Sequence, residues 1–71
     1  MNSLSFIVSV EERVKQIRDM NILNKKIVVV TKHANVEGRL IEIAETIIVI
    51  LPQIGFGFSV KIEDILLITW E

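Results

Sequence analysis

Apolar residues follow a helical period near the start of the chain and give way to β-rich runs further on. Ser9 stands three residues before Glu12, which is a capping-box pattern for the start of a helix. Val10, Val14 and Ile17 then recur on one helical stripe. The pattern therefore predicts an amphipathic helix that ends near residue 20.

The segment just before this helix, LSFIVSV at residues 4–10, fits two structures. Leu4 and Phe6 alternate with Ser5, which favours a short strand with one apolar face. The alternative is a single longer helix that begins near Leu4. The sequence leaves both open, so the N-terminal element is assigned to residues 4–20 as a strand or a helix.

From Lys26 onward, β-branched runs alternate with turn residues, a pattern typical of short strands. The predicted strands are 27–31, 36–44, 47–51, 58–62 and 65–70. The only Pro/Gly cluster, PQIGFG at 52–57, predicts a loop. A helix followed by five short strands with tight connections predicts a mainly β fold. We expect a strongly bent small barrel over residues 26–70, in a single domain spanning 1–71.

The strand VEGRLIEIA changes its apolar phase part-way along. Val36, Gly38 and Leu40 share one face, whereas Ile41 and Ile43 carry the apolar role afterwards. A change of phase within one strand requires a bulge or a sharp bend. Gly38 supplies a position without a side chain, where another backbone can approach closely. The sequence therefore predicts a bent strand with a structural glycine.

The composition predicts association with other copies of the chain. Hydrophobic residues make up 51% of the sequence and aromatic residues only 6%, so the apolar mass is aliphatic. The runs IVVV, IIVIL and ILLI are apolar on both faces, which one small interior cannot absorb. A symmetric homo-oligomer would bury the remainder.

Charge and cysteine content limit the classes of function. Eight Lys and Arg face nine Asp and Glu, so the net charge of −1 gives no general attraction for nucleic acid. The absence of cysteine excludes disulfides and thiolate metal sites. The apolar segment at 4–10 is too short to cross a bilayer. We therefore expect a soluble, cytoplasmic protein without membrane partners.

Residues of the bent strand match a known motif. Val36, Gly38, Leu40 and Ile43 fit the apolar-x-Gly-x-Leu-x-x-apolar frame of the Sm1 motif, and the run 47–51 fits its continuation. Over residues 10 to 70 the chain resembles the Sm and Sm-like family, which includes the bacterial RNA chaperone Hfq. Other SH3-like small barrels have similar spacing. The resemblance implies an Sm-like or SH3-like small barrel with an N-terminal helix.

The same resemblance implies an assembly and a ligand. Sm-like subunits form rings, in which the strand at 58–62 of one subunit would pair with the strand at 65–70 of the next. Members of the family bind single-stranded RNA. The chain departs from the family pattern, because Ala44 stands where the motif has an aspartate, and Glu63 and Asp64 occupy the second RNA-contacting loop. An acidic loop is unfavourable for phosphate binding.

Four residues are the candidate RNA contacts. Lys61 and Arg39 would meet phosphates, while Phe56 and Phe58 lie two residues apart and would share one face for base stacking. As groups, the basic residues at the start of the barrel, Arg39 among them, and those on the helix are interpreted as solvated surface. These groups are Lys25, Lys26, Lys32 and Arg39 at the start of the barrel, and Arg13, Lys15 and Arg18 on the helix.

The sequence offers no catalytic or metal-binding constellation. His33, the only histidine, is interpreted as a solvated turn residue, and no nucleophile–base pair follows from the spacing. We therefore expect neither an enzyme nor a cofactor. Two functions remain: an Sm-like ring that binds single-stranded RNA, or a structural or protein-interaction module without a nucleotide site.

Overall fold

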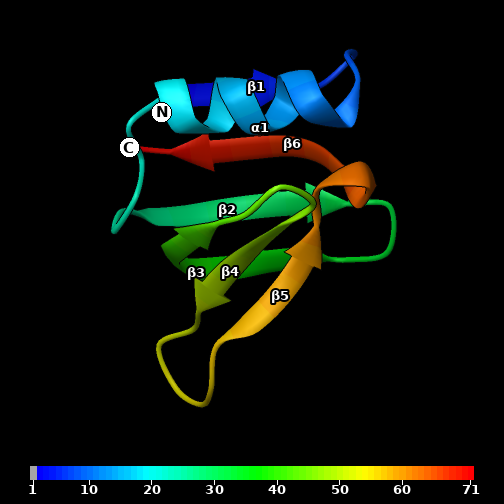
Figure 1. The fold of residues 1–71 in the computed structure, drawn as a ribbon. Coiled ribbons are helices and arrows are strands. Elements are labelled where there is room, and N and C mark those ends of the chain that lie inside the picture. The colour runs from blue at the N-terminus through cyan, green and yellow to red at the C-terminus, as the bar shows by residue number, and fades with distance from the viewer. Residues whose placement is uncertain (1) are drawn as a thin grey trace.

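The structure is a computed structural model that describes residues 2–71. It contains one antiparallel sheet, one α-helix and one 3-10 turn (Figure 1). The elements are β1 (Asn2–Ser5), α1 (Val10–Asp19), β2 (Lys26–Thr31), β3 (Asn35–Ile43), β4 (Ile47–Leu51), β5 (Phe58–Lys61), η1 (Ile62–Asp64) and β6 (Ile65–Trp70). The strand order is β1-β6-β2-β3-β4-β5, so β1 and β5 are the two edges of an open sheet.

The mainly β fold with a preceding helix is confirmed, but the prediction of a five-stranded barrel is wrong in two respects. Residues 2–71 form six strands, and the two edge strands do not pair to close a barrel. The additional strand is β1, which pairs with β6 from Asn2 opposite Trp70 to Ser5 opposite Leu67. The pairing has a physical cause: β1 covers backbone groups of β6 that would otherwise form an exposed edge.

The capping signal at Ser9 determines where the helix begins. The Ser9 side chain accepts a hydrogen bond from the Glu12 backbone N–H at 3.4 Å, and α1 starts at the next residue. The alternative of one longer helix from Leu4 is therefore wrong. The predicted end is confirmed, because Met20 is the C-cap and Asn21 has a positive φ of 55°.

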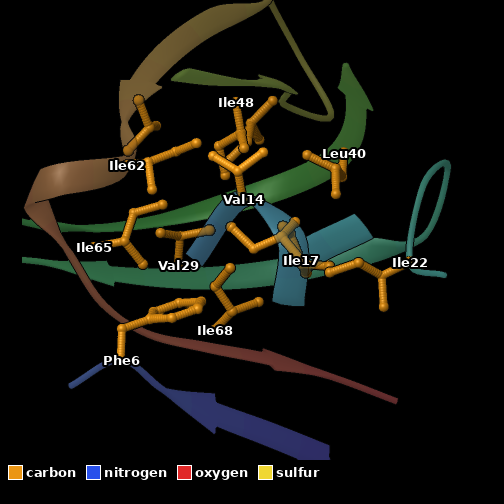
Figure 2. Packing of buried hydrophobic residues seen from close by; sticks show 13 residues of the cluster. Phe6, Val14, Ile17, Ile22, Val29, Leu40, Ile48, Ile62, Ile65 and Ile68 are labelled. Atoms are coloured by element: carbon orange, nitrogen blue, oxygen red, sulfur yellow. The ribbon is translucent and has the colours of Figure 1, made fainter. Parts of the chain in front are cut away.

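A single hydrophobic cluster joins the helix to the sheet. Its buried members are Phe6, Val14, Ile17, Ile22, Ile27, Val29, Leu40, Ile48, Ile50, Val60, Ile62, Ile65 and Ile68. Figure 2 shows Val14 and Ile17 of α1 in the middle of this cluster, among side chains from strands on several sides. The sheet is thus bent around one interior, and α1 covers the side that the strands leave open.

The predicted bulge and structural glycine are both confirmed in β3. Its register against β4 shifts between Leu40 and Glu42, which is where the apolar phase changes. A Cβ atom on Gly38 would lie 2.6 Å from Ile50 Cγ2 and 2.7 Å from the Leu51 carbonyl oxygen. Only glycine allows β4 to pass this close to β3, and this contact positions the β4–β5 hairpin.

Candidate binding surface

The two predicted cationic RNA contacts lie at opposite ends of β4. Arg39 stands opposite Leu51, whereas Lys61 stands opposite Ile47. These positions are four residue steps apart along the strand, which is roughly 13 Å at about 3.3 Å per residue. The structure therefore does not bring Arg39 and Lys61 together as one phosphate-binding pair.

The two predicted stacking residues lie in different environments. Phe58 begins β5 opposite the buried Ile50 and is 36% exposed, so it borders the core. Phe56 lies outside the strand, in the loop between β4 and β5, and is 94% exposed. The alternation that predicted a shared face applies only within a strand, and β5 starts too late to include Phe56.

The tip of the β4–β5 hairpin is an exposed apolar surface. Ile54 is 89% exposed and lies two residues before Phe56 in the same loop. Gly55 between them has a φ of +105°, a conformation that favours glycine and turns the loop. In Figure 1 the hairpin extends away from α1 and β1, so the tip stands clear of the core. The sequence analysis singled out Phe56 but treated Ile54 as a plain loop residue, so it did not predict that the two form one exposed apolar surface.

Three of the four basic residues at the start of the barrel gather at one end of the sheet. Lys26 stands opposite Arg39, and Lys25 is its chain neighbour. These residues line two adjoining surface hollows of about 480 and 390 Å³, one of which also contains Trp70. Lys32 lies elsewhere, since its backbone N–H donates to the Asp64 carbonyl at 3.0 Å.

Acidic residues offset part of this basic group. The Lys26 ammonium lies 3.0 Å from a carboxylate oxygen of Glu37, and both side chains are well exposed. Glu71 lines the larger hollow as well. A surface ion pair of this kind adds little stability, but it halves the net charge that the two lysines present. The hollow is thus close to neutral.

Arg13 has a structural role, although its position on the polar side of α1 predicted a solvated side chain. Its Nη1 donates to three carbonyl oxygens around η1, those of Ile62, Glu63 and Ile65, at 3.2–3.3 Å. Its Nε donates to the Val8 carbonyl at 2.9 Å. Arg13 therefore joins the start of α1 to the turn that connects β5 and β6. No local pattern in the sequence links residues about 50 positions apart.

Arg13→Ala should lower the free energy of unfolding by about 2 kcal/mol, because hydrogen bonds from a charged donor to half-buried carbonyls are lost together. Lys15→Ala, on an exposed position of the same helix, is the matched control and should change it by less than about 0.5 kcal/mol. Urea unfolding of both variants measures the difference. Equal effects would contradict the structural role of Arg13.

The remaining sequence candidates do not assemble into a site. His33 Nε2 lies 3.9 Å from an Asp64 carboxylate oxygen, at the exposed turn after β2. Within residues 2–71 no three His, Asp or Glu side chains are close enough together to hold a metal ion. Over the same residues, no helix has the length and apolar character needed to cross a membrane.

Comparison with known proteins gives no relative for this chain: no family model, no curated protein and no solved structure matches it. The resemblance to Sm-like proteins therefore depends on the residues of β3 and on the order of the elements. The exposed hairpin tip and the open sheet edges are the surfaces that can bind a partner.

Proposed function

We propose that this chain is a non-catalytic protein-interaction module that assembles with copies of itself, on an Sm-like version of the small β fold. The observation that carries the proposal is the β4–β5 hairpin. Its tip exposes Ile54 and Phe56 almost completely, and its outer strand β5 is an unpaired edge. Both features are costly in an isolated chain and favourable in a complex.

The chemistry of the tip fits a protein partner. Aromatic and aliphatic anchors that enter a pocket supply most of the affinity at protein interfaces. Ile54 and Phe56 flank Gly55, and no charged residue occurs in the loop at 52–57. A contact made by this loop therefore depends on burial of apolar surface rather than on charge, and should be insensitive to salt.

Single-stranded RNA binding is the second candidate, and one observation favours it. Lys25, Lys26 and Arg39 line adjoining hollows at the same end of the sheet, with Trp70 in the larger one. Cations beside an aromatic ring are the usual elements of a single-strand binding groove. The two carboxylates in the larger hollow and the distance of Lys61 from this group favour the interaction module instead.

The test is the mass of the purified protein in solution, by light scattering and native mass spectrometry over a wide range of concentration. We expect a homo-oligomer whose mass does not change when oligo-U or oligo-A is added. Stoichiometric uptake of either oligonucleotide, lost at high salt, would make RNA binding the function. A protein that stays monomeric at every concentration would overturn the assembly proposal.

Serine at both tip positions, Ile54→Ser with Phe56→Ser, should weaken self-association at least tenfold, because loss of buried apolar anchors at an interface costs this much or more. Leu23→Ser is the matched control, since Leu23 is a half-exposed apolar residue in the connection between α1 and β2. The dissociation constants from sedimentation equilibrium provide the comparison. Equal weakening by the two changes would remove the tip from the interface.

A further inference from the structure

The backbone of β5 shows which of its groups face the open edge. The Ile62 N–H donates to the Thr46 carbonyl at 2.9 Å, so this pair is hydrogen-bonded. Hydrogen-bonded and non-hydrogen-bonded pairs alternate along antiparallel strands. Val60 therefore directs its N–H and C=O toward β4, whereas Ser59 and Lys61 direct theirs outward. No strand within residues 2–71 pairs with that side of β5.

The same reasoning applies to β1 at the other edge of the sheet. The Phe6 N–H donates to the Leu66 carbonyl at 3.3 Å, in register with Leu4 opposite Ile68. Leu4 thus directs its backbone groups toward β6, and Ser3 and Ser5 direct theirs outward. Each end of the sheet therefore presents two residues with outward-facing donors and acceptors.

The side chains at the two edges are also matched. Leu4 packs against the core from β1, and Val60 is buried in the core from β5. Ser3 and Ser5 lie on the opposite face of β1, as Ser59 and Lys61 do on β5. The sheet has six strands in alternating directions, so its two edge strands, β1 and β5, run in opposite directions. A second copy in the same orientation can therefore pair its β5 antiparallel with β1, and the core faces of both copies then lie on the same side of the joined sheet.

We infer that β1 of one copy pairs antiparallel with β5 of a second copy, an inference that rests on the proposed self-assembly. The register that satisfies the outward-facing groups places Ser5 opposite Ser59 and Ser3 opposite Lys61. Leu4 then lies opposite Val60 on the core side. The polar side chains meet on the other face, and β1 carries no charge that would repel Lys61.

Apolar residues that are exposed in the single chain gather at this joint. Two pairs beyond Leu4 and Val60, on the same face, the register brings Phe6 opposite Phe58, which is partly exposed at the edge. Past that pair the two chains leave the joint at the same end. One continues to Ile7, which is 96% exposed, and the other to Phe56. The joint thus sets the partly exposed Phe58 opposite Phe6 and places Ile7 and Phe56 at its end.

The joint differs from the one that the Sm-like resemblance implies. In that assembly β5 would pair with β6 of the neighbour, but β1 already occupies the outer edge of β6. Pairing of β1 with β5 leaves all six strands of each copy in place. The contact is head-to-tail, so each added copy exposes a new β1 or β5 edge until a ring closes.

Lys61→Pro tests the backbone contact. The φ of Lys61 is −69°, which proline adopts without strain, and its N–H faces outward, so pairing with β4 is kept. Lys61→Ala is the matched control, because it removes the charge but keeps the N–H. We expect Lys61→Pro to weaken self-association at least tenfold and Lys61→Ala to leave it unchanged. Equal association of both variants would overturn the inference.

Cysteine cross-linking tests the register without depending on the proline variant, since the chain has no cysteine of its own. Ser59→Cys chains are mixed with Ser5→Cys chains, or with Leu66→Cys chains that report pairing of β5 with β6, because Leu66 is exposed and its backbone carbonyl faces the outer edge of β6. We expect the disulfide-linked heterodimer with Ser5→Cys only. A heterodimer with Leu66→Cys alone, from an oligomeric protein, overturns this joint and leaves the proposed function intact. A strictly monomeric protein overturns both.

Discussion

Gly38→Ala should lower the free energy of unfolding by about 3 kcal/mol, which is a large share of the stability of a domain this small. The added methyl group would lie 2.6 Å from Ile50 Cγ2 and 2.7 Å from the Leu51 carbonyl oxygen. The isoleucine side chain can rotate, but the carbonyl belongs to the backbone of β4. The strand must therefore shift, and the hairpin shifts with it.

Gly57→Ala is the matched control for this prediction. A Cβ atom there would have its nearest neighbours at 3.6 Å, an ordinary contact distance, and Gly57 does not have a positive φ. Because alanine also restricts the unfolded chain, Gly57→Ala should be neutral or stabilising by up to about 1 kcal/mol. Urea unfolding at a fixed low protein concentration compares the two. Similar values for both variants would show that the approach of β4 to β3 is not tight.

The features that the sequence predicted correctly are local ones. The N-cap of α1 depends on Ser9 and Glu12, which are three residues apart, and the bulge in β3 follows from a phase change within nine residues. Gly38 could be identified because a strand interior rarely has a reason to contain glycine. In each case the interacting groups are close in the sequence, so one short window contains the whole signal.

The features that the sequence did not predict depend on contacts between distant segments. A short strand near the N-terminus was one of the two predicted alternatives, but its pairing with β6, more than 60 residues later, was not predicted. Arg13 donates to carbonyls about 50 positions away, and carbonyls leave no trace in residue type. The separation of Arg39 from Lys61 follows from strand register, which a single-residue change in loop length would alter.

The sixth strand changes how the excess of apolar residues is interpreted. Composition alone predicted oligomerisation, but it gave no direction for the contact. With β1 in place, the two free edges carry compatible backbone groups, and Ile7, Phe56 and Phe58 lie next to them. Part of the apolar excess thus lies beside the two edges of the sheet. β1 covers the outer side of β6 and forms a new edge, where the backbone groups of Ser3 and Ser5 face outward.

Ile17→Ala should lower the free energy of unfolding by about 3 kcal/mol or more, the usual range for truncating a buried isoleucine. Ile17 is fully buried in the middle of the core cluster, and α1 has only Val14 as a second buried residue (Figure 2). Its loss leaves a cavity between the helix and the bent sheet. Ile54→Ala, the same change at an exposed position, should alter stability by less than about 0.5 kcal/mol.

The unfolding experiment distinguishes two roles for α1, as part of the core or as a separable cover over the sheet. If α1 belongs to the same cooperative unit as the sheet, helical and β signals in circular dichroism will be lost together in Ile17→Ala, at a lower urea midpoint. If the helical signal alone falls early, α1 is a separable cover over a sheet that is stable without it. The second result would contradict the single core, because the thirteen buried hydrophobic residues within 2–71 form one cluster that includes Val14 and Ile17. Because the proposed self-association would raise the apparent stability, both variants are compared at a concentration where the protein is monomeric.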